Sequence, residues 1–263
     1  MLKIENLTKI FNKEEGIENQ KIALNNVSIH INKGDFVTII GGNGSGKSTL
    51  MNMISGVFEA DEGQIFIDDI NVTHMPEHKR AKYLGRVFQD PLMGTAPNMS
   101  ILENLEIASR RCKRSTFRWG FSKENEEEFL KLISSLNLGL ETRLNQKVGL
   151  LSGGQRQALT LLMATYVKPK VLLLDEHTAA LDPKTASKVL DLTEKVVREN
   201  ELTTLMITHN MKDAIKYGNR LIMLSEGKLI LDISGEEKAN LTIEDLLQKF
   251  ENTGSTVSDK LLF

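Results

Sequence analysis

The sequence predicts an α/β fold with a mainly parallel sheet, an antiparallel β layer near the N-terminus and a helical subdomain inserted into this frame. Short apolar runs typical of buried strands alternate with helical segments along most of the chain. Residues 2–7 and 27–31 instead alternate apolar and polar side chains, as the strands of a half-buried antiparallel layer do. From residue 99 to 166 the pattern is helical.

The composition is that of a globular protein. Its 263 residues, of which 40% are hydrophobic, can form one large domain or two small ones. The net charge of −2 gives no global basic field, which argues against a nucleic-acid partner. No apolar run approaches the roughly 20 residues that cross a bilayer, so a membrane role would require a partner. The single cysteine, Cys112, cannot form an internal disulfide, and no leader is seen at residues 1–5. We therefore expect a cytoplasmic protein.

The elements divide the chain into one domain and a tail. We expect one domain over residues 1–250, the helical subdomain at about 92–166 within it, and a loose tail at 251–263. The expected strands are residues 2–7, 27–31, 36–40, 64–68, 85–88, 171–174, 203–208, 221–224 and 228–231, of which the last two form a hairpin. The expected helices are residues 50–56, 100–105, 129–136, 158–167, 184–200 and 242–250.

A glycine-rich loop joins the strand at 36–40 to the following helix. It consists of Gly41, Gly42, Asn43, Gly44, Ser45, Gly46, Lys47, Ser48 and Thr49. Glycines let consecutive N–H groups point inward, and the helix N-terminus adds partial positive charge, so the loop forms a cradle for phosphate oxygens. Lys47 is expected to reach the β- and γ-phosphates, and the Ser48 hydroxyl to ligate Mg²⁺. This P-loop predicts nucleotide binding but does not say how the nucleotide is used.

Two further side chains stand at the ends of predicted strands. Phe11 could stack on a nucleotide base or could be an ordinary core residue, and the pattern leaves both readings open. Gln89 could face the Mg²⁺ if its strand lies beside the P-loop strand, or it could be ordinary polar surface.

The helical stretch begins with a capping pattern, because Ser100 precedes an apolar run and Glu103 stands at the capping-box position. A basic, aromatic segment at 110–123 lies within this stretch. It could touch phospholipid headgroups or an acidic partner loop, or it could be a solvated connection.

A second anion site is predicted at residues 151–157, where Ser152 would cap a helix whose first residues, Gly153 and Gly154, leave the backbone N–H groups unobstructed. The buried strand at 171–174 then ends in Asp175 and Glu176. Carboxylates in this position lie where open α/β sheets bind ligands. Asp175 is expected to hold the Mg²⁺ shell, and Glu176 to polarise a water for attack on the γ-phosphate.

Over nearly its whole length the chain resembles the nucleotide-binding subunits of ATP-binding cassette (ABC) transporters. The family's motifs occur in order: the P-loop at 41–49, Gln89, the signature Leu-Ser-Gly-Gly-Gln at 151–155, Asp175 with Glu176, Ala180-Leu181-Asp182, and His209. The resemblance implies an ABC ATPase fold with a P-loop NTPase core, which binds ATP and Mg²⁺.

The resemblance also implies the site residues and their roles. Two ATPase subunits would pair head to tail, and each ATP would lie between the P-loop of one and the signature of the other. The implied catalytic residues are Lys47, Gln89, Glu176 and His209, and the implied metal ligands are Ser48, Gln89 and Asp175. The implied ATP contacts are Phe11, Gly41, Asn43, Gly44, Ser45, Gly46, Lys47, Ser48, Thr49, Ser152, Gly153, Gly154, Gln155 and Asp182. Phe11 matches the adenine-stacking aromatic, Gln89 the loop that contacts the membrane partner, and His209 the histidine that contacts the γ-phosphate.

The partners implied are a second ATPase subunit, which we expect to be an identical copy, integral membrane permease subunits and an extracytoplasmic solute-binding protein. The chain would then lie on the cytoplasmic face of a bacterial membrane. His177 stands where many members have proline, and Ala179-Ala180 departs from the usual pairs. The stretch from Asp175 to Pro183 looks like a branch of importer ATPases linked with the uptake of amino acids, tryptophan-like substrates among them.

Three alternatives remain open. The same cassette could power an exporter, because the sequence carries no direction of transport. A soluble ABC ATPase acting on ribosomes or DNA is disfavoured by the single P-loop and the absence of sustained heptads. In a small-molecule P-loop kinase, Glu176 would activate an acceptor hydroxyl, but the signature at 151–155 would then have no role.

Overall fold

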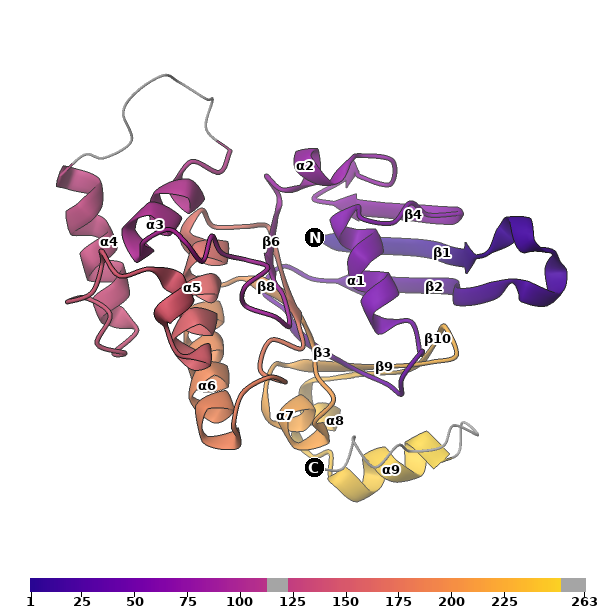
Figure 1. The fold of residues 1–263 in the computed structure, drawn as a ribbon. Helices are drawn as coiled ribbons and strands as arrows, with labels where there is room; N and C mark the ends of the chain where they lie inside the picture. Colours follow the sequence, from indigo (N-terminus) through magenta and orange to yellow (C-terminus); the bar gives the residue numbers. More distant parts are fainter. Residues whose placement is uncertain (113–122, 252–263) are drawn as a thin grey trace.

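The computed structural model describes residues 1–112 and 123–251, arranged as two sheets with helices around them (Figure 1). Most of the basic, aromatic segment at 110–123 and nearly all of the expected tail at 251–263 lie outside the described residues.

An antiparallel sheet contains β1 (Leu2–Phe11), β2 (Lys21–Ile31), β4 (Glu62–Ile67) and β5 (Ile70–Asn71), in the order β2-β1-β4-β5. The predicted β layer is thus confirmed, but β1 and β2 are longer than expected. Their pairing continues to Phe11 and Lys21 through irregularities near Asn6 and Asn26, both of which have left-handed backbone conformations. These irregularities interrupt the alternation of side chains, which is why the pattern alone gives shorter strands.

The second sheet has the order β10-β9-β3-β8-β7-β6. Its strands are β3 (Phe36–Ile40), β6 (Leu84–Val87), β7 (Val171–Asp175), β8 (Thr203–Ile207), β9 (Arg220–Ser225) and β10 (Lys228–Ser234). All neighbours are parallel except the predicted β9–β10 hairpin. The strand before Gln89 does not lie beside the P-loop strand, because β6 is at the sheet edge and β8 and β7 separate it from β3. The prediction that Gln89 faces the metal therefore rests on the family resemblance and not on strand order.

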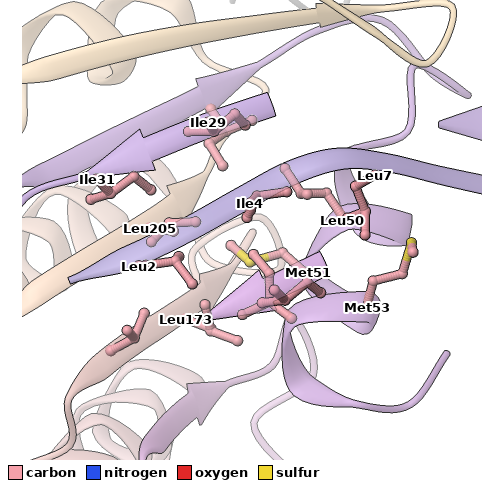
Figure 2. Close-up of a cluster of buried hydrophobic side chains, with 14 of the residues drawn as sticks. Leu2, Ile4, Leu7, Ile29, Ile31, Leu50, Met51, Met53, Leu173 and Leu205 are labelled. Carbon is pink, nitrogen blue, oxygen red and sulfur yellow. The ribbon is translucent and has the colours of Figure 1, made fainter. Parts of the chain in front are cut away.

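The largest core lies between the two sheets. Leu2, Ile4 and Ile29 of the antiparallel sheet face helix α1 (Lys47–Ser55) and the parallel sheet, where Leu173 and Leu205 complete the cluster (Figure 2). All these side chains are almost fully buried. Burying a Leu or Ile side chain stabilises the fold by about 1.5–3 kcal/mol, so this cluster fixes α1 and the preceding P-loop against both sheets.

The remaining helices are α2 (Glu77–Arg80), α3 (Ile101–Ser109), α4 (Lys123–Ser135), α5 (Gly153–Tyr166), α6 (Pro183–Glu199), α7 (Met211–Lys216), α8 (Gly235–Ala239) and α9 (Ile243–Glu251). Short 3-10 turns cover Lys13–Glu15, Ile17–Asn19 and Val148–Leu150. The capping box of Ser100 and Glu103 at the start of α3 is confirmed.

Helices α3, α4 and α5 have an apolar cluster of their own, in which Leu105, Phe129 and Leu159 are completely buried. In Figure 1 these helices stand on the side of the parallel sheet away from the antiparallel sheet. The predicted helical region thus has its own core, and α5 connects that core to the sheet.

Candidate nucleotide-binding site

The P-loop leaves the carboxyl end of β3 and is clamped by neighbouring backbone. The amide of Gly227, in the β9–β10 turn, donates to the carbonyl of Ser45 at 3.1 Å. At Gly46, φ is 102°, and a Cβ there would lie 2.5 Å from the carbonyl oxygen of Ala23 on β2. Only glycine fits a left-handed position with so close a backbone contact. The loop shape is therefore fixed by both sheets before any ligand arrives.

Lys47 lies buried at the centre of this loop. Its Nζ donates to the carbonyl oxygens of Gly41 at 2.7 Å and Gly42 at 3.0 Å. Burial lowers the pKa of Lys47, while the nearby carboxylates of Glu176 and Asp175 oppose that shift. The ammonium group is thus held where phosphate oxygens would meet the loop.

A pocket of about 200 Å³ opens above the P-loop. Its lining joins the sequence-predicted residues Phe11, Asn43, Gly44, Ser45, Gly46, Lys47, Ser48, Thr49, Glu176 and His209. The ring of Phe11 lies edge-on to Phe58, with centroids 5.4 Å apart. Phe11 thus lines the pocket and also packs against Phe58. A larger hollow of about 670 Å³ near Phe36 and Arg198 contains none of the predicted site residues.

Glu176 and His209 meet at the ends of adjacent strands. The Nε2 of His209 lies 2.5 Å from Oε1 of Glu176, and their side chains are 31% and 14% exposed, respectively. Glu176 has a φ of 47°, a left-handed conformation that is uncommon for a residue other than glycine. The hydrogen bond from His209 lowers the pKa of the Glu176 carboxyl, against the opposing effect of burial. The carboxylate is thus ionised at neutral pH and able to accept a proton.

Asp175 and Gln89 lie outside the lining of that pocket. One oxygen of Asp175, Oδ2, accepts a hydrogen bond at 3.0 Å from Nη2 of Arg86. Gln89 is two residues beyond the end of β6. Among the described residues, no group of three or more His, Cys, Asp or Glu side chains is arranged to hold a metal ion. Any metal here would need ligands from the nucleotide as well.

Three residues that sequence reasoning missed belong to this region. Lys21 and Ala23 of β2 line the pocket, and Arg86 of β6 contacts Asp175. Lys21 lies directly across from Phe11 in the β1–β2 register. This pairing would have identified Lys21 as a neighbour of Phe11. It could not be predicted, because the register of the β1–β2 hairpin is not apparent from the sequence.

A family model described as ABC transporter matches residues 24–179, more than half of the 263 residues. The chain belongs to the ABC transporter family. As the resemblance implied, it is an ATP-binding ATPase with the ABC ATPase fold.

Similar proteins cover almost the whole of this ABC ATPase. It is 50% identical over 252 residues to the tyrosine transport ATP-binding protein of Clostridioides difficile (strain R20291), covering 95% of this chain and 99% of the relative. It is 30% identical to the phosphonates import ATP-binding protein PhnC of Lactococcus lactis subsp. cremoris (strain SK11), with coverages of 95% and 99%.

A solved structure with the same fold is the dimeric, post-hydrolysis state of the ATP-binding cassette MJ0796 bound to ADP and Pi, from Methanocaldococcus jannaschii. The TM-score is 0.74 and the identity 31%, covering 89% of this chain and 98% of that chain.

The signature of this ABC ATPase forms the start of α5, away from the P-loop pocket. Ser152 Oγ accepts from the amide of Gln155 at 3.3 Å, and Gln155 Oε1 accepts from the amide of Ser152 at 3.1 Å. Ser152 and Gly153 are exposed, whereas Gly154 is buried against Thr185. Thus a single chain does not bring its signature and its P-loop together.

Asp182 caps the next helix, α6. Its Oδ1 accepts from the amide of Thr185 at 3.1 Å, and the residue is exposed. Like the signature, Asp182 lies outside the P-loop pocket of its own chain.

His177, the departure from the family pattern, is 2% exposed beneath α6. Its Nε2 lies 3.0 Å from Oγ1 of Thr193, whose hydroxyl donates to the carbonyl of Val189. Because the hydroxyl proton is used there, Thr193 can only accept from His177, so the neutral imidazole carries its proton on Nε2. Burial lowers the pKa of His177 to about 4.

We expect His177 to make the fold sensitive to acid. Below pH 6.5 unfolded His177 takes up a proton, while the folded form stays neutral until about pH 4. The unfolded state then binds more protons, so stability is lost as the pH falls, by up to about 3 kcal/mol from this residue. The His177→Gln variant keeps an N–H donor but cannot take up a proton. Its free energy of unfolding, measured by chemical denaturation, should fall less between pH 6.5 and 4 than that of the wild type. An unchanged decline would contradict this role.

Within residues 1–112 and 123–251, none of the helices combines the length and the apolar character needed to cross a bilayer. Membership of this family implies a partner ATPase and a membrane permease.

Proposed function

We propose that this chain is the ATPase subunit of a bacterial importer for an aromatic amino acid, on the cytoplasmic face of the membrane. The observation that carries the proposal is the pocket in which Phe11, the P-loop, Glu176 and His209 converge. The name of the C. difficile relative, a tyrosine transport protein, supports the substrate class. The direction of transport is supported by the import function in the name of the L. lactis relative.

Each residue in the pocket has a distinct task. Phe11 stacks on the adenine, and the P-loop amides with Lys47 bind the phosphates. Glu176 accepts the proton of the attacking water, and His209 orients Glu176 through their hydrogen bond and contacts the γ-phosphate. The strands β3, β8 and β7, which end in these groups, are neighbours in the sheet. The sheet therefore fixes the position of Glu176, the general base, relative to the phosphates bound by the P-loop.

Oxygen donors suited to Mg²⁺ lie near the carboxyl ends of β3, β7 and β6. The exposed Ser48 hydroxyl, the Asp175 carboxylate and the Gln89 amide are the oxygen ligands that Mg²⁺ prefers, and the remaining ligands would come from phosphates and water. When bound, Mg²⁺ would neutralise charge on the phosphates.

The signature and Asp182 serve a second copy of the chain. An exposed helix N-terminus outside its own pocket is suited to bind the ATP held by a partner, and the solved relative is a dimer. The active form is therefore a head-to-tail homodimer.

The permease contacts the loop that follows Gln89. Leu92, Met93 and Leu150 are 41%, 69% and 71% exposed. Their loops are tied together, because the amide of Gly149 donates to the carbonyl of Pro97 at 2.8 Å. Exposed apolar side chains of this kind mark protein interaction surfaces. The Met93→Glu variant should retain basal ATP hydrolysis but recover at least about tenfold less permease in a pull-down, because a buried charge weakens an apolar contact.

The function is tested by purifying the tagged chain from membranes of its source cell and identifying the bound proteins by mass spectrometry. A multi-span permease with an extracytoplasmic solute-binding protein is expected, together with ATP-dependent uptake of tyrosine or tryptophan by vesicles containing the complex. ATP-dependent efflux from those vesicles would instead indicate an exporter, and recovery of ribosomes would refute transport.

A further inference from the structure

Arg86 occupies a position between three parts of the site. It lies on the edge strand β6 with a side chain only 13% exposed. Its Nη2 donates to Oδ2 of Asp175 at 3.0 Å and to Oδ1 of Asn52 at 2.8 Å, while its Nη1 donates to Oγ of Ser55 at 3.0 Å. The guanidinium also lies 4.7 Å from the ring centre of Phe88.

These contacts connect the elements that carry the proposed metal ligands. Asn52 and Ser55 belong to α1, the helix whose second residue is Ser48. Asp175 is the last residue of β7, and Phe88 directly precedes Gln89. One planar guanidinium group thus holds α1, β7 and the start of the Gln89 loop together.

The contact with Asp175 uses one carboxylate oxygen. No hydrogen bond to the other oxygen, Oδ1, is found among residues 1–112 and 123–251. Fixing one oxygen of a carboxylate sets the direction of the other, and Mg²⁺ demands near-ideal octahedral geometry.

We propose that Arg86 is a positioning residue of the magnesium site, which holds Asp175 by Oδ2 so that Oδ1 would remain free to ligate the cation. This inference rests on the proposed function, in which Asp175 and Ser48 are metal ligands.

The charge of Arg86 and its hydrogen bonds have opposite expected effects on metal affinity. A positive charge close to the site repels a divalent cation, so removing it would strengthen metal binding if charge were the dominant effect. If orientation dominates, as we infer, metal binding weakens instead. Two substitutions separate these effects, because Arg86→Met removes both charge and hydrogen bonds, whereas Arg86→Lys keeps the charge and loses the planar fork.

The experiment measures Mn²⁺ binding in the presence of saturating ADP, by electron paramagnetic resonance of the free ion. We expect Arg86→Met to weaken Mn²⁺ binding about tenfold or more, the usual effect of losing a group that orients a ligand, and Arg86→Lys to weaken it less. ADP affinity in EDTA should change by less than about twofold, since the P-loop contacts are untouched.

The matched control is Arg220→Met. Arg220 has a side chain 14% exposed and is paired with Asp232 at 2.6 Å, but it lies at the amino end of β9, away from the P-loop. The Mn²⁺ affinity of the Arg220→Met variant should equal that of the wild type. Unchanged or tighter Mn²⁺ binding by Arg86→Met would overturn the inference. If that variant fails to fold, Arg86→Lys takes its place, and an Mn²⁺ affinity of Arg86→Lys equal to that of the wild type would overturn the inference. If the wild type itself binds Mn²⁺ no better than Asp175→Asn, the proposed metal site fails and the inference fails with it.

Discussion

The Glu176→Gln variant is expected to hydrolyse ATP about 1000-fold more slowly than the wild type while binding ATP with similar affinity. A general base contributes on the order of 10²–10⁴-fold to a rate. Glutamine keeps the size of the side chain and can hold the same left-handed backbone as Glu176, but it cannot accept the proton. Steady-state phosphate release and fluorescent nucleotide binding measure the two quantities.

Slow turnover should also trap the ATP-bound dimer, which gel filtration with ATP would detect. Glu201→Gln is the control, because Glu201 has a similar φ of 49° but lies next to the larger hollow near Phe36, away from the site. Near-normal hydrolysis by Glu176→Gln would remove Glu176 from the mechanism.

The Gly46→Ala variant is expected to lose ATP affinity by roughly 100-fold, equivalent to two charge-assisted hydrogen bonds of about 1.5 kcal/mol each. Its new Cβ would lie 2.5 Å from the carbonyl oxygen of Ala23, which belongs to a strand and cannot move aside. The loop must then open, and its amides no longer converge on the phosphates. We also expect a lower free energy of unfolding, by roughly 2–5 kcal/mol, from the left-handed conformation and the overlap together. Nucleotide titration and chemical denaturation measure the two effects.

The control for Gly46 is Gly139→Ala. Gly139 also has a positive φ, of 68°, but a methyl group added there would meet no atom of the described residues within 4 Å. This variant should lose only about 1 kcal/mol of stability and no ATP affinity. Equal effects at the two positions would show that backbone conformation alone, and not the contact with Ala23, explains the requirement for glycine.

Much of the fold could be predicted because the strong signals were local. The run at residues 36–40, the helix that Gly56 ends and the hairpin after Ser225 each have their own pattern of apolar residues and turns. Short elements such as α2 and α7 could not be predicted, because they depend on tertiary contacts. Arg80, at the end of α2, is almost fully buried and donates to the carbonyls of Met53 and Ile54 at the end of α1.

The order of strands could not be read from the sequence either, since pairing between distant segments leaves no local pattern. For this reason the sequence could not show that two strands separate β6, which precedes Gln89, from β3, and it gave no sign of Arg86. The P-loop residues, Glu176 and His209 could be predicted as site residues because they lie in motifs. Arg86 is recognised only by its contacts with Asn52 and Asp175.

Helix α5 is shared between two separately packed regions. Ala158 and Leu159 pack with α3 and α4, but Leu161 and Ala164 pack with the sheet, and Arg111 donates to the carbonyl of Ala164 near the end of the helix. Local opening follows such packing units. Leu162 and Tyr166, in the last turns of the helix, also pack with α3 and α4, so both regions contact α5 over the same turns. In amide hydrogen exchange, α5 should therefore be better protected than α3 and α4, because its contacts with the sheet remain when that cluster opens. A shift of α3 and α4 is then transmitted through α5 to β7, because Leu161 of the helix packs in one cluster with Leu172 and Leu174 of that strand.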